Sequence, residues 1–328
     1  MTSNTASSSE FTIPVAKYQT SLDEADILHS ANCGVIVERV GLLKAEYRSE
    51  GRVFARELAE YINVNYAGTA SVFVYEETFG TKDVVHWLIH VKSLAEYEYL
   101  VGMGSADEGF REIFTRERIP SEKGGGTWDR MFVEGTLRET VLLPQFTGMY
   151  GTEVDGDVAA KPEAVEPGSP AIVPPAAQQV PTQDENTLLH SANCGVLIHR
   201  VGQLTYEFRS EARQFAREVA RTINTNQAGR VTVLLYEEAF GRSDRLHWLI
   251  HMKSLSSYYS LIDMRAWMSE EVREVYTRER IEQDRGGGNW NRMFLDASLE
   301  DLALTPQHWG MYTTTAPQRL TNGAGAHR

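Results

Sequence analysis

The sequence contains an internal repeat. The segment Leu28–Val35 (LHSANCGV) recurs unchanged as Leu189–Val196, and His86–His90 (HWLIH) recurs as His247–His251. Three further matches keep nearly the same offset: Tyr75–Gly80 with Tyr236–Gly241, Thr115–Ile119 with Thr277–Ile281, and Gly124–Trp128 with Gly286–Trp290. Because a repeat of this length is one structural unit, the chain is predicted to fold as two copies of the same domain.

The repeat also sets the expected domain boundaries. The two copies cover residues 26–150 and 187–312. Residues 151–186 are rich in Pro, Ala, Val and Glu, a composition typical of a disordered linker. Residues 1–25 and 313–328 are expected to be disordered tails. A linker of this length lets the two copies pair face to face.

Each copy has the pattern of an α+β domain. Strands are expected at 34–40, 71–79, 84–92 and about 130–143 of the first copy. Helices are expected at 49–63, with Ser49 as N-cap, and from Ser93 towards Arg118. The order β-α-β-β-α-β is that of the ferredoxin-like fold, so the predicted fold class is two ferredoxin-like domains in one chain.

Composition and charge exclude several kinds of partner. The formal net charge is -13, with 45 acidic against 32 basic residues. Nucleic acids and anionic membrane surfaces require a basic face, so neither is expected as a partner. Without a leader-like N-terminus the chain is expected to be cytoplasmic. Its two cysteines, Cys33 and Cys194, are expected to be small buried side chains rather than a disulfide.

The strand at 84–92 suggests a site. Val85, Trp87 and Ile89 lie on one face and belong under the helices, whereas His86 and His90 lie on the other. A four-residue hairpin loop would put Glu77 opposite His86, Tyr75 opposite Leu88 and Phe73 opposite His90. With the second copy, the candidate catalytic set is His86, Glu77, Tyr75, His90, His247, Glu238, Tyr236 and His251. A structural interface between two sheets remains the alternative for the same residues.

The spacing of His86 and His90 also occurs in zinc-protease helices. On a strand, residues four apart are separated by about 13 Å, too far to share one zinc ion. The β-branched residues favour a strand, so a zinc-protease site is rejected. A metal bound by one of these histidines together with Glu77 stays open as an alternative.

The glycine-rich loops are followed by candidate substrate-binding residues. Trp128 and Arg130, with Trp290 and Arg292 in the second copy, would border a pocket for a planar ligand. They equally fit a role in anchoring the loop. The glycine runs at Gly124 and Gly286 could present N–H groups to an anion, although a simple turn is favoured.

The repeated unit resembles the dimeric α/β-barrel superfamily, on the run from Val74 to Leu94 and its element order. That superfamily includes antibiotic-biosynthesis monooxygenases, polyketide cyclases and relatives of the NIPSNAP and EthD type. The resemblance implies that the two copies close into one barrel, an intrachain pseudo-dimer, and that the cleft between each sheet and its helices or loops holds an aromatic or polyketide-like substrate. Glu38 of the first copy is His199 in the second, so both are added as candidate substrate-binding residues.

The function expected from this resemblance is acid/base-initiated oxygenation or cyclisation of a hydrophobic small molecule. His86 and His247 would move the proton, Glu77 and Glu238 would orient them, and the tyrosines would hold an oxyanion. No Rossmann or P-loop motif is present, so no tightly bound organic cofactor is expected. A non-catalytic binder or assembly protein, and a metal-dependent enzyme, are the alternatives. A further homodimer remains open.

Overall fold

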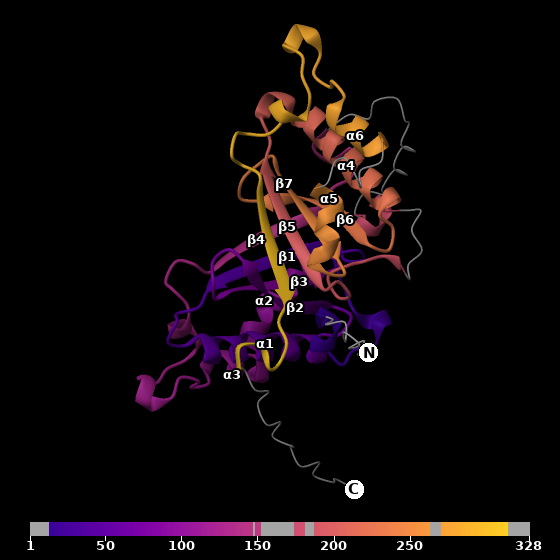
Figure 1. Cartoon of the computed structure of the whole chain (residues 1–328). Helices are drawn as coiled ribbons and strands as arrows, with labels where there is room; N and C mark the ends of the chain where they lie inside the picture. The colour runs from indigo at the N-terminus through magenta and orange to yellow at the C-terminus, as the bar shows by residue number, and fades with distance from the viewer. Residues whose placement is uncertain (1–12, 147, 152–173, 181–186, 263–269, 314–328) are drawn as a thin grey trace, which may run out of the picture.

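The computed structural model describes residues 13–146, 148–151, 174–180, 187–262 and 270–313. Eight antiparallel strands form one closed barrel in the order β1-β3-β2-β8-β5-β7-β6-β4. Figure 1 shows this barrel at the centre, with α1 and α3 on one side and α4 and α6 on the other. Closure removes free sheet edges, so each half completes its sheet against the other.

The two halves have the same order of strands. The strands are β1 (Val35–Leu42), β2 (Ala70–Phe79), β3 (Val84–Val91), β4 (Arg138–Pro144), β5 (Val196–Gln203), β6 (Val231–Phe240), β7 (Arg245–Met252) and β8 (Glu300–Pro306). Within each half the spatial order is 4-1-3-2, as expected for a ferredoxin-like sheet. The halves meet where β2 pairs with β8 and where β4 pairs with β6.

Helices cover the outer face of each sheet. The first half has α1 (Arg48–Asn65), α2 (Leu94–Ala106) and α3 (Glu108–Thr115), and the second has α4 (Arg209–Asn226), α5 (Tyr259–Ile262) and α6 (Glu270–Thr277). Apolar residues of α1 at positions 54, 58 and 62 recur at helical spacing and pack on the sheet with Trp87. Separate clusters lie under each helical layer, and a third fills the barrel interior.

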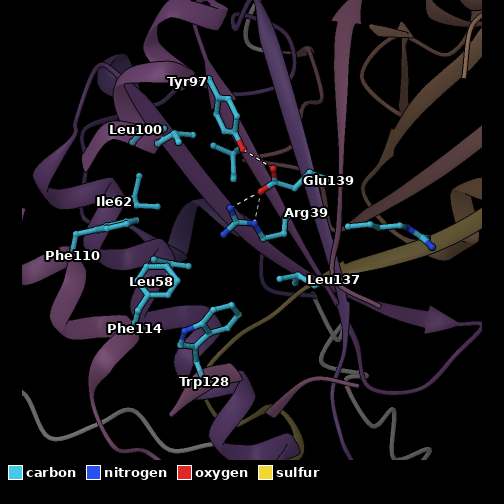
Figure 2. Close-up of a pocket in the computed structure, with 13 residues that line it drawn as sticks. Arg39, Leu58, Ile62, Tyr97, Leu100, Phe110, Phe114, Trp128, Leu137 and Glu139 are labelled. Atoms are coloured by element: carbon cyan, nitrogen blue, oxygen red, sulfur yellow. Dashed lines mark hydrogen bonds and ion pairs between the residues drawn. The ribbon is translucent and has the colours of Figure 1, made fainter. Parts of the chain in front are cut away.

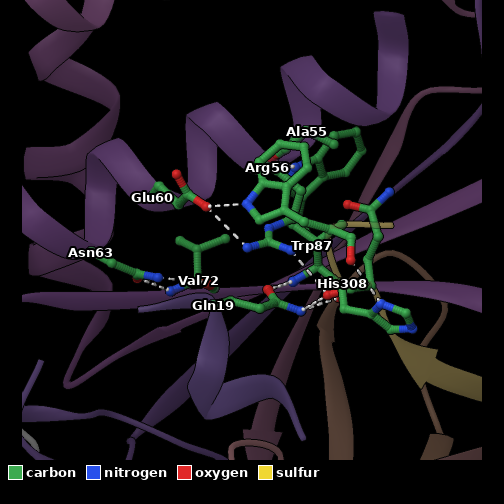
Figure 3. Close-up of polar contacts among 11 residues, drawn as sticks. Gln19, Ala55, Arg56, Glu60, Asn63, Val72, Trp87 and His308 are labelled. Atoms are coloured by element: carbon green, nitrogen blue, oxygen red, sulfur yellow. Dashed lines mark hydrogen bonds and ion pairs between the residues drawn. The ribbon is translucent and has the colours of Figure 1, made fainter. Parts of the chain in front are cut away.

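The segment after β8 reaches across to the first half (Figure 3). After β8 the chain crosses to α1, where the Gln307 carbonyl accepts from Arg56 and Gln19, and Trp309 donates to Glu60. Gln19 pairs with both backbone groups of Val74 and so extends the edge of the sheet. These contacts tie the second half to the first outside the barrel.

Two short segments that were expected to be disordered are helical, and each is held by hydrogen bonds to a strand of the barrel. Short 3-10 helices at Ala16–Gln19 and Ala176–Gln179 lie in the segments expected to be a disordered tail and linker. Gln179 bonds to the backbone of Leu235 as Gln19 does to Val74. The matching positions show that these short segments belong to the repeated pattern. Residues 1–12, 152–173, 181–186 and 314–328 lie outside the described residues.

Three expectations about local structure were wrong. The strand expected at 130–143 begins only at Arg138, because the Trp128–Met131 turn packs Trp128 on Phe54 with the rings stacked 5.6 Å apart. The helix expected from Ser93 to Arg118 divides at Asp107, whose side chain accepts the Phe110 N–H and caps α3. Helix α1 begins at Arg48 after Tyr47, so Ser49 is not its N-cap.

The predicted register of the β2–β3 hairpin was wrong by two residues. His86 lies opposite Tyr75 rather than Glu77, and His90 lies opposite Ser71. The β2–β3 pairing ends at Glu76 and Val85, and beyond it Glu77 and Phe79 pair only with β8, along the other edge of β2. Since side chains alternate with a period of two, this shift leaves every residue on its predicted face.

Candidate functional site

The histidine faces of β3 and β7 lie inside the barrel. His86, Leu88 and His90 point inward and are buried, whereas Trp87 belongs to the cluster under α1. The faces predicted for this strand are therefore confirmed. The segment is also confirmed as a strand, which is incompatible with a zinc-protease helix.

Glu38 is the centre of a polar chain that crosses the barrel. Its Oε1 atom lies 2.9 Å from Nδ1 of His86 and 3.2 Å from Nδ1 of His199. His86 continues through Nε2 to Oε1 of Glu77 at 3.3 Å. The sequence placed Glu38 and His199 at corresponding positions, and the structure brings them into contact.

This series of polar contacts continues into the second half. Nε2 of His199 lies 2.8 Å from Nδ1 of His247, and Nε2 of His247 lies 3.5 Å from Oε2 of Glu238. Neither atom of this last pair makes a hydrogen bond, although both are buried. We call the six residues Glu77, His86, Glu38, His199, His247 and Glu238 the barrel chain.

Protonation differs between its two ends. His86 contacts a carboxylate at each nitrogen, a geometry that requires an imidazolium. Burial alone would lower the pKa of His86, but hydrogen bonds to Glu38 and Glu77 raise it. Burial opposes ionisation of Glu38, yet His199 and His86 hold its pKa well below the usual range. Burial lowers the pKa of His247 to about 4, so this ring is neutral at pH 7.

The other predicted catalytic residues lie at the opposite end of the barrel. Nε2 of His90 lies 2.9 Å from the Ser191 hydroxyl, and Nε2 of His251 lies 2.9 Å from that of Ser30. Each ring also contacts a backbone carbonyl through Nδ1. Burial lowers both pKa values to about 3, so these rings are neutral and bonded on both sides.

Tyr75 and Tyr236 belong to this second group. Their hydroxyls donate to the Ser191 and Ser30 carbonyls of the opposite half. The Ser30 and Ser191 hydroxyls in turn accept each other's backbone N–H at 3.0 Å. The repeated segment at residues 28–35 therefore closes one end of the barrel.

A cavity of about 530 Å³ lies on the other side of the first sheet, between β1, β3 and β4 and the helices α1, α2 and α3. Figure 2 shows its aromatic wall, formed by Phe110, Phe114 and Trp128. Leu58, Ile62 and Leu100 complete the apolar lining that the figure labels. The predicted placement of Trp128 beside a pocket agrees with this position.

One polar cluster interrupts this lining. Nε of Arg39 donates to Oε1 of Glu139 at 2.7 Å, and the Tyr97 hydroxyl donates to Oε2 at 2.9 Å (Figure 2). Burial and the bond to Glu139 raise the pKa of Tyr97 to about 12, so it remains a hydrogen-bond donor at neutral pH. A charged cluster at one wall of an apolar cavity can orient a ligand.

The second half repeats this arrangement at a smaller size. A cavity of about 260 Å³ is lined by Trp290, Tyr276 and Phe215. Arg200 donates to both oxygens of Asp301 at 2.7 Å, and Tyr258 donates to Oδ2 of Asp301 at 3.1 Å.

Arg130 and Arg292, predicted to bind substrate, hold the glycine loops instead. Arg130 donates to the carbonyl of Gly124 at 2.7 Å, and Arg292 to that of Gly286 at 2.9 Å. Gly124 has φ 95°, in the left-handed region, and its own N–H bonds to Ser121 within the turn. Neither arginine lines either cavity.

Sequence reasoning missed Arg39, Tyr97 and Glu139. The signal was present: Arg39 falls on the face of β1 that the alternation places under helices, and the second half has Arg200 there. A charged residue on a covered face needs a partner, and a search for an acidic residue on the neighbouring strand would have found Glu139.

Three further observations concern the described part of the chain. No group of three or more His, Cys, Asp or Glu side chains there is placed to hold a metal ion. Among the helices described, none has the length and apolar character needed to cross a bilayer. Cys33 and Cys194 are buried and unpaired.

No curated protein matches the chain. Similar solved structures include a proposed monooxygenase from Lactobacillus acidophilus, with 10% identity, a TM-score of 0.46, and 83% of this chain and 94% of that chain covered. An anthrone oxidase-like protein has 7% identity, a TM-score of 0.46 and coverage of 86% and 94%. A chlorite dismutase variant from Candidatus Nitrospira defluvii has 12% identity, a TM-score of 0.41 and coverage of 84% and 92%.

A single family model, described as a family of unknown function (DUF6039), matches residues 5–312 and so spans both halves. The chain belongs to the DUF6039 family.

Proposed function

We propose that the protein binds an aromatic, polyketide-like small molecule in the first-half cavity and acts on it by acid/base chemistry. The observation that carries this proposal is the cavity itself. Its volume of about 530 Å³ suits a ligand of several fused rings, and aromatic and aliphatic side chains dominate its lining. Among the described residues that line it, the charged ones are Arg39, Arg138 and Glu139.

The polar cluster supplies the chemistry in this proposal. Polyketide-like molecules carry acidic C–H and O–H groups beside carbonyls. Glu139 would accept such a proton, while Arg39 and the Tyr97 hydroxyl would stabilise the resulting enolate oxygen. The carbanion can then attack a carbonyl of the same molecule, which is a cyclisation, or react with dioxygen, which is an oxygenation.

A second candidate site is the barrel chain. One observation favours it: the buried Nε2 of His247 and Oε2 of Glu238 face each other without a hydrogen bond. In this alternative His86 and His247 move the proton, as their strand positions suggested. Replacing both by Gln would abolish turnover if the barrel interior were the active site. It would leave turnover intact in any folded variant if the chemistry occurs in the outer cavity.

We also infer that the chain arose by tandem duplication of one ferredoxin-like unit. Identical segments at a near-constant offset and the same strand order in both halves support this origin. The barrel would then be an intrachain version of a dimer, and the smaller second cavity would have diverged from the first.

The binding site is tested by narrowing the cavity. Val101 lines it and is 65% exposed at its edge, so Val101→Trp is expected to obstruct it without disturbing the core. Affinity for a fluorescent aromatic probe, followed by titration, should fall at least about tenfold, which corresponds to about 1.4 kcal/mol. Val64→Trp is the matched control, because Val64 is similarly exposed on α1 and does not line the cavity. Equal affinities in the two variants would contradict the proposed site.

Turnover separates an enzyme from a binder. Glu139→Gln keeps the shape of the wall but removes the base, so product formation from an aromatic polyketide should fall about 100-fold or more while binding is retained. Glu134→Gln, at an exposed position outside the cavity, is the control. Unchanged product formation would exclude Glu139 as the base, and binding without any turnover in the unmodified protein would favour a non-catalytic binder.

A further inference from the structure

Glu38 and His199 occupy corresponding positions of the two halves and touch each other. Each is the middle residue of a matching triplet, Val-Glu-Arg in β1 and Ile-His-Arg in β5. Both side chains are buried, and Oε1 of Glu38 lies 3.2 Å from Nδ1 of His199. The other members of the barrel chain are identical between halves: Glu77 with Glu238, and His86 with His247. This position alone in the barrel chain differs.

The contact explains why the difference matters. If two first halves formed the barrel, the residue facing Glu38 would be a second Glu38. Two buried carboxylates at this distance cannot both be ionised, and one would have to take up a proton or move apart. If two second halves formed it, His199 would face His199 beside the two neighbouring His247 rings. Only the mixed barrel places a carboxylate against an imidazole at this pair of positions.

The surroundings of Glu38 strengthen this requirement. His86 from β3 approaches Oε1 of Glu38 at 2.9 Å, and beyond it lies Glu77 from β2. On the opposite side His199 is backed by His247 from β7 and then Glu238 from β6. One carboxylate thus receives an imidazole from each half, and a second carboxylate at position 199 would leave four carboxylates and only two imidazoles in the barrel chain.

We propose that the Glu38–His199 contact determines which half pairs with the first half in the barrel. It stabilises a barrel made of one first half and one second half, and it destabilises a barrel made of two first halves. Two nearly identical sheets would otherwise present the same edges and the same interior to each other. Because Glu38 and His199 differ and meet where the halves face each other, their contact is favourable when a first half pairs with a second half. The inference is independent of the proposed function, because neither residue lines either outer cavity.

Exchange of the two residues in the full-length chain provides the test. His199→Glu and Glu38→His are each expected to lower the melting temperature by roughly 5 °C or more, the scale set by a lost buried charge pair in a chain of this size. The double variant Glu38→His with His199→Glu restores the pair in mirrored order, so it should recover most of that loss. A control pair made in the same way at exposed Glu134 and at His308 should change little.

Mixing the two single variants tests partner selection itself. Both halves of the His199→Glu chain carry a carboxylate at this position, and both halves of the Glu38→His chain carry an imidazole. A carboxylate–imidazole contact can therefore form only between the two chains. Refolding the mixture from denaturant should give a heterodimer by native mass spectrometry, with a melting temperature near that of the unmodified protein. A double variant no more stable than the single ones, or a refolded mixture that contains no heterodimer, would overturn the proposal.

Discussion

Lowering the pH from 7 to 5 is expected to unfold the protein, because several of its histidines are held neutral in the fold. The pKa is lowered to about 3 for His90 and His251 and to about 4 for His29 and His247, in each case first by burial. The ordinary value in an unfolded chain is about 6.5. Between these values the unfolded chain binds protons that the folded protein does not, so stability is lost as the pH falls through this window.

The size of the effect follows from the number of protons. Each such histidine lowers the free energy of unfolding by about 1.4 kcal/mol per pH unit below about pH 6. Four of them acting from pH 6.5 to pH 5 amount to roughly 5 kcal/mol or more, comparable to the whole stability of many domains. His86 acts in the opposite sense, since its raised pKa adds stability below about pH 6.5 that is lost as the pH rises, but it is a single group.

Denaturant unfolding at pH 7.5, 6.5, 5.5 and 4.5 measures this dependence. The variant with His90→Gln and His251→Gln removes two of the groups, so the fall in stability per pH unit should lessen by about half, although its stability at pH 7.5 is expected to be lower. His308→Gln, in the segment that follows β8, is the control. A pH profile as steep in the double variant as in the unmodified protein would show that these two rings do not cause the acid sensitivity.

The sequence was most informative about which face of a strand each side chain lies on. In β3 the alternation placed Trp87 under the helices and His86 inside the barrel, and both placements are confirmed. The hairpin register was wrong by two residues without consequence for the faces, because Glu77 still points inward and Glu76 outward. Strand periodicity determines a face, whereas register depends on where the β2–β3 pairing ends, and beyond that point β2 pairs only with β8, which is distant in sequence.

Strand alternation did not predict the position of the cavities, although the resemblance implied a cleft between each sheet and its helices or loops. The conserved spacing within the repeat drew attention to the histidines, and the structure instead places the cavities on the opposite face of each sheet. The second helical segment of the first half determines where its cavity forms. It divides at Asp107, which accepts hydrogen bonds from Tyr61 and caps α3, so that α2 and α3 diverge over the sheet. Asp is a preferred N-cap residue, so Asp107 is a local signal for the break, whereas its contact with Tyr61 is distant in sequence.

The largest effect of a single substitution is expected at Arg213 of α4, whose side chain lies against Glu237 of β6. Nε of Arg213 bonds to both oxygens of Glu237 at 3.0 Å, and Nη2 bonds to Asp244 at 2.6 Å. The side chains of Arg213 and Glu237 are 2% and 0% exposed, so water cannot replace either partner. Arg213→Met leaves the Glu237 carboxylate buried without its partner, and the free energy of unfolding should fall by about 3–5 kcal/mol.

Two comparisons distinguish this explanation from a simple loss of packing. Arg273→Met removes an ion pair with Glu270 whose side chains are 56% and 86% exposed, and it should cost less than about 1 kcal/mol. Adding Glu237→Gln to Arg213→Met removes the orphaned charge and should recover part of the loss, because an unpaired amide is less costly to bury than an unpaired carboxylate. Urea unfolding at pH 7.5 gives all three values. If the double variant were no more stable than Arg213→Met alone, the cost would lie in the packing of the arginine side chain against β6 and not in the charge that it neutralises.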